Sequence, residues 1–180
     1  MARIAPNVKN VQIGFGNLDY RHKSAFENYA DYVFDLLKYS SYSSLRIMHP
    51  TYNWDIEHQL SELDVYWLGN YNNCSEIIKR NAGTLKLLSL EFKGEERFDS
   101  VWDILGYQDG IVYPNVHTLH LDNRVYEWVN SKPSGDIDSD YAPFPALRYL
   151  KTSRNYAITD DVLFRGNEKT LERINVSVHK

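Results

Sequence analysis

One pattern of apolar and polar residues recurs along this chain. An apolar residue is followed by two variable residues, a second apolar residue, one variable residue and a third apolar residue, as in Val-His-Thr-Leu-His-Leu at 116–121. On a strand, the second and third apolar side chains point to one face and the residues between them to the other. The pattern therefore predicts short strands that each bury one face. Its copies lie near 8–13, 42–48, 60–66, 85–91, 116–122, 147–152 and 171–177.

Two registers fit the second copy. In the first, Tyr42, Leu45 and Ile47 occupy the apolar positions. In the second, Leu45, Met48 and Pro50 occupy them. Proline has no backbone N–H and would remove a donor from the ladder of hydrogen bonds between strands. We therefore prefer the register that begins at Tyr42.

The residues before the strands are of two kinds. Pro114 and Pro145 lie just before their strands, where proline stops a helix and sets an extended backbone without the loss of a ladder bond. Asn81 and Asn167 each lie three residues before a Thr-Leu pair that begins the next copy. Asparagine at such a position can end a helix in the left-handed conformation. The matched offsets indicate that both segments approach their strands in the same way.

Apolar residues at steps of three and four predict helices between several of the strands. We expect helices at about 24–39 and 98–106, and shorter ones at 75–81 and near 125–129. The connection between the second and third strands is too short for a full helix. The polar, acidic stretch 131–143 is typical of a flexible insertion.

The copies begin about 27 residues apart on average, although the individual lengths are uneven. Repeats of about 20 to 30 residues form arrays in which each unit buries its apolar side only against its neighbours. Stacked units of this kind would make a parallel sheet whose apolar face meets the returning helices and loops. The chain of 180 residues is long enough for one core. We therefore predict a single α/β domain, 1–180, of about seven irregular repeats.

These features are similar to those of the leucine-rich-repeat family, and in particular to the irregular, ribonuclease-inhibitor-like repeats found downstream of F-box segments in fungal and other eukaryotic proteins. The resemblance rests on Pro-Asn-Val-His-Thr-Leu-His-Leu at 114–121, Pro-Ala-Leu-Arg-Tyr-Leu at 145–150, Arg-Asn-Ala-Gly-Thr-Leu at 80–85 and Gly-Asn-Glu-Lys-Thr-Leu at 166–171. It implies a leucine-rich-repeat solenoid with a curved parallel sheet on the concave side and irregular helices and loops on the convex side.

Family members of this kind hold a protein substrate on the repeat array while the F-box docks on a ubiquitin-ligase adaptor. The resemblance thus implies a module for protein–protein interaction. It implies an adaptor as a partner only if an F-box exists outside this chain, because no F-box-like helical segment precedes the first repeat. The alternative is a structural repeat fragment without a dedicated ligand, or one that self-associates through an uncapped end of the solenoid.

The residues between the buried positions define the concave surface on which a partner protein would bind. These residues are Arg46, Glu62, Asp64, Tyr66, Leu87, Ser89, Glu91, Thr118, His120, Asp122, Tyr149, Lys151, Ser153 and Arg173. Their charge grades from acidic in the middle units to basic in the last two, which suits a partner of mixed charge. Tyr66 and Tyr149 are the best candidates for anchors, because tyrosines carry much of the binding energy at protein interfaces.

Composition narrows the class of function. The net charge of −4 and the scattered lysines and arginines argue against a nucleic-acid interface, which needs a basic face. No apolar run approaches the roughly 18 residues of a membrane span, and the N-terminus lacks a signal-peptide pattern. The single cysteine, Cys74, excludes an internal disulfide and suits a reducing compartment. We therefore expect a cytoplasmic or nuclear protein without membrane contact.

No pattern in the sequence predicts an enzyme, a cofactor or a metal site. Gly-Phe-Gly at 14–16 follows a strand, but Asp19 replaces the third glycine of a dinucleotide-binding loop. Asp-Ile-Asp-Ser-Asp at 136–140 resembles the start of a calcium loop, but the required glycine and glutamate do not follow. His117 and His120 lie three apart on a strand and so face opposite sides. Cys74 has no local partner that would activate it as a nucleophile.

Overall fold

The computed structural model describes residues 8–13, 32, 40–48, 59–67, 72–92, 101–123, 140–153 and 161–177. Within these residues the chain forms seven strands with short helices between them. The strands are β1 (Asn10–Ile13), β2 (Ser44–Met48), β3 (Glu62–Trp67), β4 (Leu87–Phe92), β5 (Thr118–Asn123), β6 (Tyr149–Ser153) and β7 (Arg173–Ser177). The helices are α2 (Asn72–Arg80), α3 (Val101–Ile104) and the 3-10 helix η3 (Asp161–Phe164).

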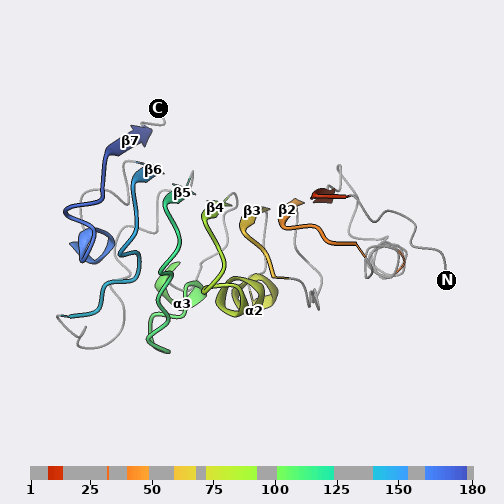
Figure 1. Cartoon of the computed structure of the whole chain (residues 1–180), viewed down its shortest axis with the longest axis horizontal. Coiled ribbons are helices and arrows are strands. Elements are labelled where there is room, and N and C mark those ends of the chain that lie inside the picture. The colour runs from red at the N-terminus through yellow and green to blue at the C-terminus, as the bar shows by residue number, and fades with distance from the viewer. Residues whose placement is uncertain are drawn as a thin grey trace.

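All seven described strands form one parallel sheet in the order β1-β2-β3-β4-β5-β6-β7. Each strand therefore pairs with its neighbours in the sequence, and Figure 1 shows them side by side in a single row. This confirms the predicted parallel sheet of an α/β chain. Each strand begins two residues after the start of its apolar pattern, because the first apolar residue of the pattern lies before the strand. Leu60, Leu85 and Val116 are such residues, and all three are buried.

The register of pairing repeats from strand to strand. Val11 pairs with Leu45, and Leu45 pairs in turn with Leu63. All three side chains are buried, so the apolar positions of successive units form continuous rows inside the molecule. The preferred register of the second copy is correct, because Ile47 follows Leu45 into the core and Tyr42 is buried before the strand.

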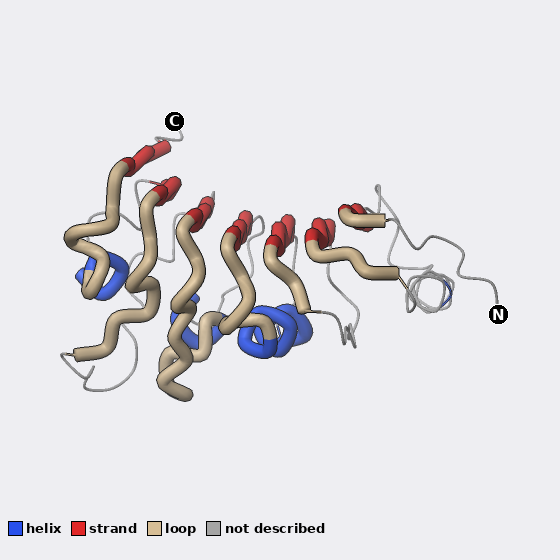
Figure 2. Tube along the Cα trace, in the orientation of Figure 1, coloured by secondary structure: helices blue, strands red, loops and turns tan. Residues whose placement is uncertain are grey.

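The described helices lie on one side of the sheet. In Figure 2 the row of strands is bent, and α2, α3 and η3 all lie on the side away from its hollow. We call the side that meets these helices the covered face and the opposite side the open face. None of the described helices is long and apolar enough to cross a membrane.

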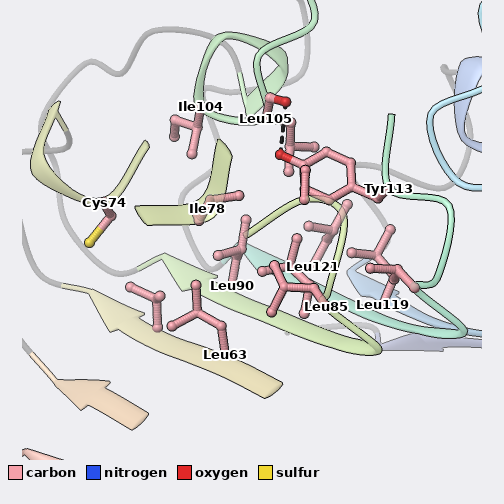
Figure 3. Close-up of a cluster of buried hydrophobic side chains, with 14 of the residues drawn as sticks. Leu63, Cys74, Ile78, Leu85, Leu90, Ile104, Leu105, Tyr113, Leu119 and Leu121 are labelled. Carbon is pink, nitrogen blue, oxygen red and sulfur yellow. Dashed lines mark hydrogen bonds between the residues drawn. The ribbon is translucent and has the colours of Figure 1, made fainter. Parts of the chain in front are cut away.

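The core lies between the covered face and the helices. Leu63 and Leu90 point into it from the strands, and Ile78 from α2 and Ile104 from α3 meet them from the other side (Figure 3). Burial of one aliphatic side chain of this size contributes about 1.5 to 3 kcal/mol. Because the core runs continuously beneath neighbouring strands, each unit depends on the units beside it.

Asn81 joins two successive units. It is buried directly after α2, and its Nδ2 donates a hydrogen bond of 2.9 Å to the Ile77 carbonyl in the last turn of that helix. Its Oδ1 accepts a bond of 2.8 Å from the backbone N–H of Leu60 in the preceding unit. The hydroxyl of Thr84 donates to the Leu60 carbonyl at 2.8 Å. The Asn-x-x-Thr sequence thus ends a helix and also ties it to the strand before it.

Asn167 has the corresponding place after η3. It is buried, and its Nδ2 donates to the Leu163 carbonyl at 2.7 Å. Thr170 donates to the Leu147 carbonyl of the preceding unit at 2.9 Å. The backbone N–H of Leu171 donates to the Asn167 carbonyl at 2.9 Å, as Leu85 does to Asn81 at 3.0 Å. The matched offsets in the sequence therefore correspond to matched turns in the structure.

The two prolines before β5 and β6 also lie in matching turns. Tyr113 and Phe144, which precede Pro114 and Pro145, are buried and stack with ring centroids 5.1 Å apart and an angle of 22° between the rings. In both units the carbonyl of the aromatic residue accepts a bond from the N–H three residues later, at 3.3 and 3.1 Å. The prolines thus occupy the second position of tight turns, where the sequence suggested an extended backbone.

The helix predictions are met in part. The helix expected at 75–81 is α2, which begins three residues earlier. The range 98–106 expected to be helical contains α3, and turns follow α3 in the chain. Of the helix expected at 24–39 the structure describes Tyr32, which is helical and exposed. The helix expected near 125–129 lies outside the described residues, as do the segments 14–19 and 131–139.

The last residues of the predicted insertion 131–143 pack against the neighbouring unit. Pro143 is buried, and its carbonyl accepts a hydrogen bond of 2.8 Å from the backbone N–H of Tyr113. The hydroxyl of Tyr141 donates to the Ile111 carbonyl at 2.6 Å. Residues 141–143 therefore belong to the packed turn before β6.

Candidate protein-binding surface

The open face consists of the alternate strand residues that point away from the core. Because the register is constant, these residues form rows that cross the strands at a spacing of about 4.8 Å. The first row is Asn10, Ser44, Glu62, Leu87, Thr118, Tyr149 and Arg173. The second is Gln12, Arg46, Asp64, Ser89, His120, Lys151 and Asn175. The third row contains Met48, Tyr66, Glu91 and Asp122. On the last two strands, Ser153 of β6 pairs with Ser177 of β7.

Every residue that the sequence predicted for partner binding occupies a register position on this face. The structure thus brings together side chains that lie about 25 to 30 residues apart in the chain, such as Tyr66, Glu91 and Asp122. Most of these side chains are half-buried by their neighbours, whereas Arg46, Glu62 and Arg173 are exposed. No described helix lies over the open face (Figure 2).

Arg46 and Asp64 form an ion pair on the open face. The two residues are register partners on β2 and β3, and the Arg46 Nε lies 2.7 Å from the Asp64 Oδ2. The Arg46 side chain is about half exposed, so solvent screens the pair and limits its contribution to stability. Its effect is to reduce the net negative charge at the β2–β3 side of the face.

His120 and Tyr149 form an aromatic contact in the middle of the open face. Their rings meet edge to face, with centroids 5.6 Å apart and an angle of 75°. Partial burial lowers the pKa of His120, the positive charge of Lys151 lowers it further, and the negative charge of Asp64 opposes both effects. The His120 ring is therefore neutral at neutral pH and acts here as a flat, weakly polar surface.

The charge of the open face changes along the row of strands. Glu62, Asp64, Glu91 and Asp122 lie on β3 to β5, whereas Lys151 and Arg173 lie on β6 and β7. The predicted change from acidic middle units to basic later units is therefore present on the surface itself.

Three residues at the edge of this surface were missed in the prediction of the binding site. They are Lys86 directly before β4, His117 directly before β5 and Arg148 directly before β6. All three are exposed. Each occupies the first variable position of the apolar pattern, where alternation alone would direct the side chain inward. A polar residue at the same position in three successive units was the available signal.

Cys74 lies on the covered side, within the core (Figure 3). Burial raises the pKa of its thiol, so the thiol is uncharged and shielded from solvent. Within the described ranges, no group of three or more histidine, cysteine, aspartate or glutamate side chains is arranged to hold a metal ion.

Comparison with known protein families, with curated proteins and with solved structures found no match. The argument on function therefore rests on the sheet, its register and the chemistry of the open face.

Proposed function

We propose that this chain is a leucine-rich-repeat module that binds a partner protein on its open face. Three observations support the proposal: the strands follow one another in sequence order, the described helices lie on one side of the sheet, and the uncovered side carries aromatic and charged residues. The observation that matters most is the constant register, because it collects tyrosines and charges from separate units into one continuous surface.

The similarity of the Pro-x-Val and Asn-x-x-Thr-Leu approaches to repeats downstream of F-box segments extends the proposal. In this view the chain is the substrate-reading part of an F-box-type ubiquitin-ligase receptor. Its single cysteine, which is buried, is compatible with a reducing cytoplasmic or nuclear environment.

Alanine substitutions at Tyr66 and Tyr149 test partner binding. The tagged double variant Tyr66→Ala/Tyr149→Ala should capture much less of the specific partner from native cell extract than the unchanged chain does, because interface tyrosines act as anchors. Tyr32→Ala is the matched control, since Tyr32 is 61% exposed and lies outside the sheet. Thermal unfolding of each variant separates loss of binding from loss of fold. Undiminished capture by a folded double variant would contradict the proposal.

Self-association is the second candidate, and the edge strand β7 favours it. Ile174 and Val176 are register partners of the buried Leu150 and Thr152, yet they are 49% and 42% exposed. An edge strand with exposed apolar residues can pair with a second chain. Sedimentation over a wide concentration range should then show a dimer that Ile174→Lys abolishes. A monomer at every concentration would exclude this candidate.

A further inference from the structure

The two edges of the described sheet differ in how much apolar surface they expose. On the edge strand β7, Ile174 and Val176 are 49% and 42% exposed, although the residues paired with them on β6 are buried. On the opposite edge strand, β1, Val11 and Ile13 are 9% and 8% exposed. Figure 1 shows β7 at the end of the row of strands. Association through β7 would therefore cover more apolar surface than association through β1.

The backbone of β7 presents the same two residues to its free edge. The N–H of Arg173 donates a hydrogen bond of 3.0 Å to the carbonyl of Arg148, which directly precedes β6. In a strand, the N–H and C=O groups of successive residues point to opposite sides. Those of Arg173 and Asn175 are therefore directed at β6, and those of Ile174 and Val176 are directed away from it. A second strand can thus bond to Ile174 and Val176 and also cover their side chains.

We propose that β7 pairs with β7 of a second copy of this chain, antiparallel and about a two-fold axis at Asn175. This inference deepens the self-association candidate and does not depend on partner binding through the open face. In this arrangement Arg173 lies opposite Ser177 of the second copy, and Ile174 lies opposite Val176, so all five residues of β7 are paired. Ile174 and Val176 exchange backbone hydrogen bonds with each other, as opposite residues do at alternate positions of an antiparallel pair.

The side chains favour the register centred on Asn175. A register centred one residue earlier would place Val176 opposite the exposed Glu172, and one centred one residue later would place Ile174 opposite a residue beyond β7. With the axis at Asn175, the two copies of Arg173 lie four residues apart along the strands, or about 14 Å. This distance exceeds the Debye length of about 8 Å at physiological ionic strength, so the two like charges repel little.

A two-fold pairing covers more apolar surface than a head-to-tail contact does. It joins two β7 edges, so Ile174 and Val176 of both copies are covered in one interface. A head-to-tail contact would join β7 to β1, where Val11 and Ile13 are already buried, and it would continue from chain to chain. The two-fold pairing closes as a dimer. Because its axis is perpendicular to the sheet, the open faces of the two copies lie on the same side of one continued sheet.

Cysteine substitutions test the register. Opposite residues that do not share hydrogen bonds in an antiparallel pair have Cα atoms about 4.5 Å apart, within the range of about 4.4 to 6.8 Å that a disulfide requires. Asn175→Cys should therefore link most chains in pairs under mild oxidation, which a non-reducing gel shows as a dimer band. Arg173→Cys is the matched control and should link few, since Arg173 is also exposed but would lie about 14 Å from its counterpart. The native Cys74 is buried and remains in each variant.

Val176→Pro tests the backbone pairing. Proline removes an N–H that points away from β6 and keeps an apolar side chain, a change that an edge strand tolerates. Val176→Pro should halve the sedimenting mass at concentrations where the unchanged chain is a dimer, and thermal unfolding should show that the fold remains. Tyr32→Ala should leave the mass unchanged, since Tyr32 lies outside the sheet. A dimer that persists in folded Val176→Pro would overturn the pairing.

The inference and the self-association candidate can fail separately. If the chain forms a dimer but Asn175→Cys links no more chains than Arg173→Cys does, self-association stands and the pairing at Asn175 is wrong. If the chain is a monomer at every concentration, both are wrong, and the edge of β7 is open to a strand from another protein. Capture of a partner by Tyr66→Ala/Tyr149→Ala tests the open face independently of either result.

Discussion

The side-chain oxygen of Asn81 accepts a hydrogen bond of 2.8 Å from the backbone N–H of Leu60, which lies 21 residues earlier in the chain. The same amide donates to the Ile77 carbonyl at the end of α2. One buried side chain therefore satisfies polar groups in two units, and it replaces bonds that water would otherwise supply. Contacts of this kind make the stability of one unit depend on the unit before it.

Substitution of Asn81 should destabilise the chain strongly. Asn81→Ala leaves the buried Leu60 N–H without its acceptor and removes the side-chain bond to the Ile77 carbonyl, which keeps its bond of 3.2 Å from the backbone N–H of residue 81. The expected cost is about 3 kcal/mol in the free energy of unfolding. Asn115→Ala is the control, because Asn115 is exposed and donates a single bond of 2.7 Å to the Gly83 carbonyl. It should cost about 1 kcal/mol or less. Urea unfolding measures both, and equal losses would contradict the role assigned to Asn81.

Three glycines should respond differently to alanine. Gly106 has φ +72° and an added Cβ would lie 2.8 Å from the Ile111 Cδ1, so Gly106→Ala combines backbone strain with a steric clash. Gly110 has φ +66° with open space around it, so Gly110→Ala should cost about 1 kcal/mol from strain alone. Gly83→Ala meets neither problem and should be neutral or stabilise by about 0.5 kcal/mol. Thermal unfolding should rank Gly106→Ala as the most destabilising of the three.

The pH dependence of stability should show the environment of His120. Burial, reinforced by Lys151, lowers its pKa in the folded state, so below the usual pKa of about 6.5 the unfolded chain binds more protons than the folded chain. His120 thus favours folding fully above that pH, and this contribution is lost as the pH falls below it. Urea midpoints measured from about pH 7.5 to 5.5 should fall less for His120→Gln than for the unchanged chain.

Substitution of Lys151 separates the two causes of the His120 shift. Lys151→Gln removes the neighbouring positive charge but leaves most of the burial, so the decline in stability toward low pH should become smaller without disappearing. Parallel declines for the unchanged chain, His120→Gln and Lys151→Gln would contradict this assignment.

The positions of the strands follow from local pattern, and the sequence was sufficient for them. Apolar residues at every second position indicate a strand with one buried face. Leu63 and Val65, and likewise Leu88 and Leu90, are such pairs and are buried. The helices were less certain, because their ends depend on tertiary contacts. A helix was expected at 98–106, and α3 spans Val101–Ile104 within that range. The turn after α3 depends on the left-handed backbone of Gly106.

Turn geometry and edge exposure were not determined by local pattern. Pro114 and Pro145 lie in tight turns because the aromatic residues before them stack on each other between units, which no single segment specifies. His117 occupies a position that alternation directs inward, but the backbone turns before β5 and leaves it exposed. The edge-to-face contact between the rings of His120 and Tyr149 likewise depends on the pairing of β5 with β6.

The sequence by itself determined which side chains face the core and which face away, because the two-residue period of a strand is a local property. Only the tertiary structure decided which of the outward residues become neighbours. Parallel pairing in one constant register places Glu91 beside Asp122, and Lys86 beside His117, although each pair lies 31 residues apart in the chain. The arrangement of charges on the open face is a product of that register, since each unit contributes only one or two of them.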